Sequence, residues 1–233
     1  MVSPCLANYL SRMDWPALLL SIRLGGLTAL ILLPIGIVVG RWLALRRFRG
    51  RAIVEATLAI PLLLPPTVIG FYLLTAFGGH SPLGQAWQAM FGHTLAFSFE
   101  GLLLAAVLVN IPFAVQPIQR AFEAVPPELR DAAAACGASP WRVLRAVDLP
   151  LAWPGILTGL VLTFAHTIGE FGVALMIGGA IPGETRTISI AIYDRVQAFD
   201  MSAAGAMSFV LLALSLAALS LVYALSRRGR RGV

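Results

Sequence analysis

Long uncharged runs are the feature that most limits what this chain can fold into. A helix of about 20 apolar residues spans the roughly 30 Å hydrocarbon core of a membrane. With 58% hydrophobic and only 12% charged residues, a soluble domain of 233 residues could not bury this much apolar surface. The composition therefore predicts an integral membrane protein. The uncharged runs are Leu24–Gly40, Ala56–Phe99, Gly101–Gln119, Leu149–Gly169 and Met201–Ser226.

The second run is too long for a single crossing, because glycines and Pro82 interrupt it after Phe77. We predict a span that ends at Phe77 and a connecting loop over residues 78–96. The expected fold is an all-α polytopic membrane protein, one domain over residues 1–233. Its five transmembrane helices are expected at about residues 16–40, 56–77, 100–119, 149–172 and 202–226.

The basic residues predict the orientation of the chain in the membrane. All 17 are arginines, and 13 of them follow the first predicted span, lie in or beside segment 120–148, or end the chain. The positive-inside rule then places the N-terminus outside, and segment 120–148 and the C-terminus in the cytoplasm. The net charge of +6 is thus a topology signal, and no nucleic-acid partner is expected.

A charged, alanine-rich segment, 126–150, lies between two predicted spans. Pro127 suits the first turn of a helix, and the run Asp131–Ala135 favours helix with little side-chain bulk. Gly137 suits the end of that helix, and Ser139 is a good N-cap for a second one. The pattern predicts a helix, a break and a second helix. The small side chains of the first helix would let another protein approach its backbone closely.

This segment resembles the cytoplasmic coupling loop of the permease subunits of binding-protein-dependent ABC importers. That loop reads E-A-A, three residues, G, nine residues, I-x-L-P, and here Asp replaces Glu and Val147 replaces Ile. The resemblance implies a type I importer permease fold, with a coupling loop over residues 120–148 that docks an ATPase. The residues that it implies for coupling are Asp131, Ala132, Ala133, Gly137, Ala138, Ser139, Arg142, Leu149 and Pro150.

Three further strings are similar to the molybdate, tungstate and sulfate branch of this family. They are the Pro65-Pro66 stretch, IGEFG over residues 168–172, and IPGETRTI over residues 181–188. The resemblance implies a multi-pass protein of the bacterial inner membrane that imports molybdate by alternating access. Sulfate, thiosulfate or tungstate is the alternative substrate. The implied partners are a second copy of the chain, two cytoplasmic ATPase subunits, an extracytoplasmic oxyanion-binding protein and membrane lipid.

The sequence contains no lysine, so it cannot contain the phosphate-binding motif G-x-x-x-x-G-K-[ST]. If the importer is driven by ATP, then ATP and Mg²⁺ bind on a separate subunit, and no cofactor or metal is expected here. A membrane-bound enzyme would need a nucleophile, metal or acid–base cluster, which the sequence does not display. A secondary transporter or channel would need carboxylates deep in several spans, and only Glu100 and Glu170 lie near one.

Glu170 ends an apolar run, where a carboxylate is costly unless it faces water, a cavity or a partner. It is a candidate gate residue, or a brace for the flanking Gly169 and Gly172. A substrate-ligand role is disfavoured because a carboxylate repels a dianion. His166 lies four residues earlier on the same helix face, so it can pair with Glu170.

The turn at Pro182-Gly183 is predicted to lie outside the membrane. Two interpretations stay open for it. Glu184 and Arg186 either form a rim that contacts a binding protein, or they belong to a solvated turn.

Overall fold

The computed structural model describes residues 13–230, so Arg12 and Arg231, which enter the arginine count, lie outside the described residues. All of the regular secondary structure in this range is helical. The helices are α2 (Trp15–Leu45), α3 (Arg51–Leu63), α4 (Pro66–Phe77), α5 (Pro82–Phe91), α6 (Phe99–Glu123), α7 (Pro127–Ala135), α8 (Pro140–Val143), the π-helical η1 (Leu144–Asp148), α9 (Leu149–Gly169), α10 (Gly172–Gly178), α11 (Ile188–Gln197) and α12 (Met201–Arg230).

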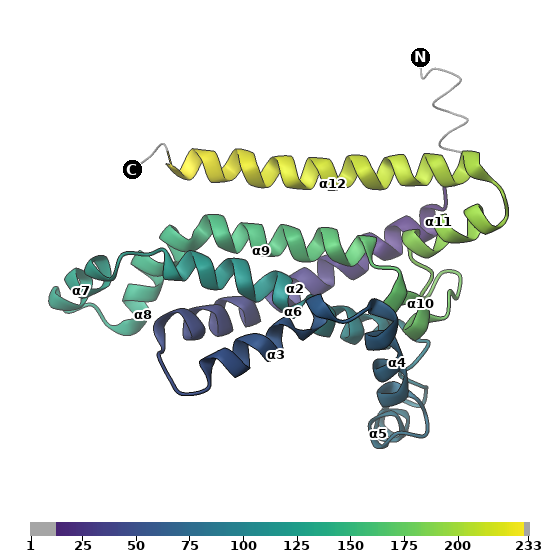
Figure 1. The fold of residues 1–233 in the computed structure, drawn as a ribbon, viewed down its shortest axis with the longest axis horizontal. Helices are drawn as coiled ribbons and strands as arrows, with labels where there is room; N and C mark the ends of the chain where they lie inside the picture. Colours follow the sequence, from purple (N-terminus) through teal and green to yellow (C-terminus); the bar gives the residue numbers. More distant parts are fainter. Residues whose placement is uncertain (1–12, 231–233) are drawn as a thin grey trace, which may run out of the picture.

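Among the described residues, four helical stretches are long and apolar enough to cross a membrane. They are α2, α6, the continuous stretch Pro140–Gly169 and the Met201–Ser220 part of α12; a bent fifth span arises if α3 and α4 are counted together. Helices α2, α6 and α9 form the centre of the bundle, and α12 lies along α9 on the outside (Figure 1). The predicted all-α membrane fold is confirmed.

The second predicted span, 56–77, is not one straight helix. Helices α3 and α4 meet at an angle of 105°, and α4 leads away from the bundle to α5 (Figure 1). Leu64 precedes a proline and is extended, and neither Pro65 nor Pro66 has an N–H to continue the helical ladder. Within the predicted loop 78–96 lies helix α5, whose first turn is capped by the Ser81 hydroxyl.

Small residues let the central helices approach closely. A Cβ built on Gly159 of α9 would lie 2.9 Å from the Ala114 carbonyl oxygen of α6. Near it Ile118, Phe122 and Ile156 form a buried cluster. Such small-residue contacts are typical of helices that pack in membranes, where van der Waals contact and not water exclusion holds them together.

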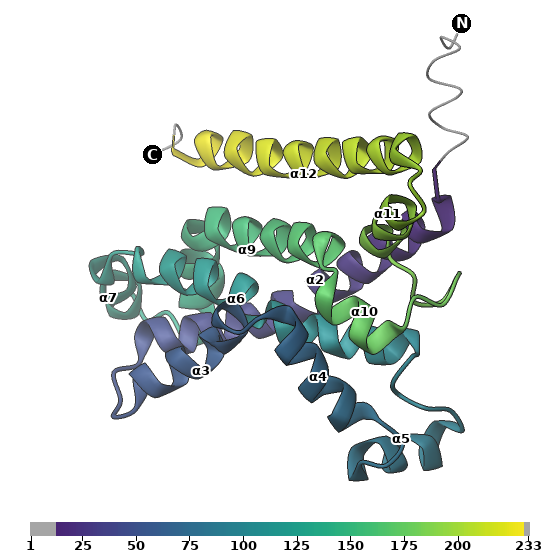
Figure 2. The same ribbon diagram turned by 45° about the vertical axis from the view of Figure 1, so that its right-hand side comes forward.

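The two ends of the bundle carry different elements. Helices α7 and α8 lie at the end of the bundle at which α12 finishes, whereas the start of α2 lies at the other end with α10 and α11 (Figures 1 and 2). Within residues 13–230, α2 therefore begins at one end of the bundle and α12 finishes at the other.

Candidate functional site

The segment predicted to dock an ATPase forms two short helices, α7 and α8, and α8 continues through η1 into α9. After α7, Gly137 adopts a left-handed backbone with φ of +78°. Its N–H donates to the Ala134 carbonyl, and that of Ala138 donates to Ala133, which closes the helix end. The Ser139 hydroxyl then accepts from the Arg142 N–H at 3.4 Å and starts α8. The predicted helix, break and helix are confirmed.

This helix pair presents an exposed surface. Leu129 and Trp141 are large apolar side chains that leave 46% and 65% of their surface exposed. Sequence reasoning missed both, although an apolar residue in a charged segment is a usable signal for a partner. Of the residues implied by the resemblance, Asp131, Ala132, Gly137, Ser139, Arg142 and Pro150 are exposed, and Ala133, Ala138 and Leu149 are partly buried.

A fully buried carboxylate anchors the helix pair to the bundle. Asp148 has no exposed surface, and it pairs with two arginines from distant elements. Arg41 of α2 donates from Nε to Oδ2 at 2.8 Å, and Arg130 of α7 donates from Nε to Oδ1 at 2.6 Å. Two guanidinium groups therefore compensate the buried charge, and the three residues join α2, α7 and the start of α9.

A short π-helical turn brings Asp148 into this position. In η1 the Leu149 N–H donates to the Leu144 carbonyl, five residues earlier. Pro150 follows and has no N–H, so the ordinary helical ladder cannot continue unbroken here. Such turns change the direction in which a side chain points and are frequent at functional positions.

Glu170 lies in the break between α9 and α10. Its Oε1 accepts from the Val173 N–H at 3.0 Å, and its carbonyl oxygen accepts from the Ser189 hydroxyl at 2.7 Å. Gly172 approaches α4, where a Cβ would lie 2.8 Å from Pro66, whereas Gly169 has open space beside it. The carboxylate thus caps α10 and holds the break, while its other oxygen faces His166.

His166 belongs to a polar cluster that joins α9 to α6. Its Nδ1 lies 3.0 Å from Asn110 Oδ1, while Asn110 Nδ2 donates to the Ala106 carbonyl. Nδ1 therefore carries the proton, and Nε2 faces Glu170 Oε2 at 3.9 Å. The ring stacks on Phe113 with centroids 3.9 Å apart. Sequence reasoning missed Asn110, a buried amide in an apolar helix.

The two rim candidates occupy different environments. Glu184 is exposed, whereas Arg186 is held by ion pairs to Asp14 at 3.5 Å and to Asp194 at 3.0 Å. Arg186 thus ties this turn to the start of α2 and to α11. As for metals, no group of three or more His, Cys, Asp or Glu within residues 13–230 is placed to hold an ion.

A membrane bundle that carries an anchored helix pair at one end is the architecture of an importer permease subunit. The fold matches the crystal structure of a bacterial alginate ABC transporter in complex with an alginate pentasaccharide-bound periplasmic protein, with a TM-score of 0.76. The match covers 98% of this chain and 83% of that chain at 16% identity, so it supports the fold alone.

The family model of the binding-protein-dependent transport system inner membrane component matches residues 33–231, and the chain belongs to this family. It is 43% identical to the molybdenum transport system permease protein ModB of Azotobacter vinelandii, over 96% of this chain and 99% of that protein. It is 36% identical to the sulfate transport system permease protein CysT of Escherichia coli, over 82% of this chain and 70% of that protein.

Proposed function

We propose that this chain is the membrane-spanning permease of an ATP-driven importer that carries molybdate across the bacterial inner membrane. The observation that carries the proposal is the exposed α7–α8 pair, anchored through Arg130 and Asp148 to the transmembrane bundle. An ATPase bound to this pair can move α2 and α9 through the buried ion pairs. The permease itself catalyses no reaction, and ATP and Mg²⁺ bind on the ATPase.

The helix pair offers the ATPase a surface suited to a protein partner. Trp141 and Leu129 supply exposed apolar area, and the alanines of α7 let the partner approach the backbone. Gly137 has no atom within 4 Å of the position of a Cβ, so the space beside it is open for a partner. Two ATPase subunits on two permeases would complete the cytoplasmic side.

A second copy of the chain would cover surfaces that one bundle leaves exposed. None of the residues of α3 is buried, and Leu63 leaves 81% of its side chain exposed. Phe71 and Tyr72 of α4 are 57% and 65% exposed on a helix that projects from the bundle (Figure 2). The pathway would then run between the two copies, with Glu170 and His166 as gate candidates.

The orientation follows from charge. With α7 and α8 on the cytoplasmic side, the arginine-rich connection between α2 and α3 lies on that side as well. The N-terminus and the turn that carries Glu184 then face outward, where an oxyanion-binding protein would dock.

Uptake of labelled molybdate by the reconstituted transporter, with its ATPase and binding protein, tests this function. Molybdate uptake that needs ATP and persists in excess sulfate is expected. The second candidate is a sulfate permease, which the 36% identity to CysT favours. If excess sulfate abolishes molybdate uptake and sulfate is itself transported, the substrate of this importer is sulfate and not molybdate.

A further inference from the structure

Three open cavities follow one face of α6. The first, of about 170 Å³, is lined by His166, Glu170 and Phe113. The second, of about 330 Å³, shares Phe113 and adds Gln116, and the third, of about 250 Å³, shares Gln116 and Arg120 with the second. The cavities therefore adjoin, and together they form a track from the α9–α10 break toward the end of the bundle that carries α7.

The track is lined by one helical face of α6. Phe113, Gln116 and Arg120 are spaced by three and four residues, as neighbours on one face are. Gln116 and Arg120 are exposed, and the buried Gln119 also lines the third cavity, whereas Ile118 is buried and lines none of the three cavities. The last cavity of the track is lined by the Arg120 guanidinium and the Gln116 amide, both hydrogen-bond donors, and also by Glu55 and Gln119.

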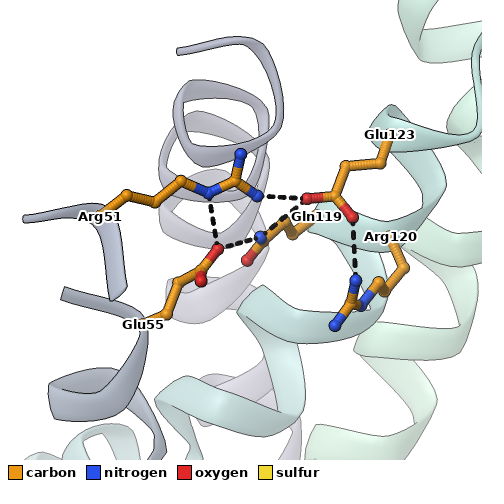
Figure 3. Close-up of polar contacts among 5 residues, drawn as sticks. All are labelled: Arg51, Glu55, Gln119, Arg120 and Glu123. Atoms are coloured by element: carbon orange, nitrogen blue, oxygen red, sulfur yellow. Dashed lines mark hydrogen bonds and ion pairs between the residues drawn. The ribbon is translucent and has the colours of Figure 1, made fainter. Parts of the chain in front are cut away.

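An ionic network at this end of the track holds two carboxylates, of which Glu55 lines the third cavity (Figure 3). Arg51 of α3 donates to Glu55 Oε1 at 2.8 Å and to Glu123 Oε1 at 2.6 Å. Gln119 donates from Nε2 to the same two oxygen atoms, at 2.7 and 3.0 Å. Both carboxylates are therefore engaged by donors other than Arg120.

Arg120 is bound differently from the other members of the network. Among residues 13–230 its ion pair joins Nη1 to Glu123 Oε2 at 3.1 Å, and 81% of its side chain is exposed. Exposed ion pairs contribute little free energy, so the guanidinium can change partner at low cost. The arrangement presents a cation to the track, while Arg51 offsets the charge of one carboxylate and the Gln119 amide donates to both.

We propose that Arg120 and Gln116 form an anion contact at the α7 end of the track. An oxyanion that leaves toward the cytoplasm replaces Glu123 Oε2 as the partner of the guanidinium, whose forked N–H groups match two oxygens of a tetrahedral anion. Gln116 adds a neutral donor. This inference rests on the proposed function and adds to it that Arg120 contacts the transported oxyanion.

The test compares Arg120→Gln with two control variants in the complete reconstituted transporter. Arg47→Gln removes an exposed arginine of the α2–α3 connection that lines none of the three cavities. Glu123→Gln removes the acidic partner of Arg120 but keeps an amide oxygen for Arg51. Uptake of labelled molybdate and ATPase activity stimulated by the binding protein are measured for each variant.

We expect Arg120→Gln to lower the uptake rate about tenfold, with stimulated ATPase activity within about twofold of wild type, because one charge-assisted contact is lost. Arg120→Lys should restore part of the uptake, and neither Arg47→Gln nor Glu123→Gln should reduce it. Unchanged uptake in Arg120→Gln would overturn the anion contact. Equal losses in Arg120→Gln and Glu123→Gln would also overturn it, since Arg120 would then act only by holding Glu123.

The wild-type complex separates this inference from the proposed function. A wild-type transporter that moves neither molybdate nor sulfate overturns the function and the contact together. Normal wild-type uptake with an unaffected Arg120→Gln variant overturns the contact alone.

Discussion

Arg130 and Asp148 are joined by a 2.6 Å ion pair between the first helix of the exposed pair and the start of α9. Arg130 also donates from Nη2 to the Phe122 carbonyl at the end of α6, at 2.8 Å. The remaining oxygen of Asp148 binds Arg41 of α2. Short, directed contacts therefore link α7 to three membrane helices.

Replacing Asp148 with alanine should strongly destabilise the protein. The change leaves Arg41 and Arg130 facing each other without their shared carboxylate, and breaking a buried pair costs about 3 kcal/mol. Thermal unfolding of the purified protein in mild detergent measures the loss. Arg145→Ala, an exposed position in the same π-helical turn, is the matched control. Equal midpoints for the two variants would show that the ion pairs contribute no stability.

Substitutions at Gly137 should separate backbone strain from partner contact. Asn tolerates a left-handed backbone, so Gly137→Asn should keep most of the coupling. A Cβ at this position meets no atom of the chain within 4 Å, and a tryptophan side chain would extend into the space proposed for the ATPase. Gly137→Trp should therefore abolish uptake while the protein stays in the membrane. ATPase activity and uptake in the reconstituted transporter check this. If both survive in the tryptophan variant, the coupling assignment is wrong.

Glu170 should stabilise the break between α9 and α10 as a hydrogen-bond acceptor. Glu170→Gln keeps an oxygen for the Val173 N–H, whereas Glu170→Ala loses it and should cost about 1 kcal/mol, as the loss of a helix cap does. Thermal unfolding of the two variants measures the difference. If the glutamine variant is as unstable as the alanine variant, the stabilisation comes from the negative charge of Glu170 and not from its role as an acceptor.

Cysteine labelling should report the orientation. Cys136 is exposed beside Gly137, so in a Cys5→Ser variant a membrane-impermeant maleimide should label inside-out vesicles and spare intact spheroplasts. In a Cys136→Ser variant the labelling should reverse, because Cys5 belongs to the N-terminus expected outside. Labelling of Cys136 in intact spheroplasts would contradict the proposed topology. Protection of Cys136 by the ATPase would further support docking at α7 and α8.

Local patterns predicted the parts of the fold that depend on neighbours in sequence. Gly137 and Ser139 predicted the break between α7 and α8, because a left-handed backbone and an N-cap are local requirements. Pro65 and Pro66 mark the interruption of the second span, but local chemistry does not set the direction of a bend. The angle of 105° depends on how α4 packs against α10, where Gly172 meets Pro66.

The sequence by itself determined that this chain is a helical membrane protein with an exposed helix pair, since apolar run length, arginine placement and capping residues act over a few turns. Only the tertiary structure decided which charges meet. In the sequence, nothing distinguishes Asp148 from other polar residues of its segment. In the fold, Arg41, 107 positions away, donates to its carboxylate. Glu55 and Gln119 meet across 64 positions in the same way. Ion pairs depend on distances in space, and helix packing alone sets those distances.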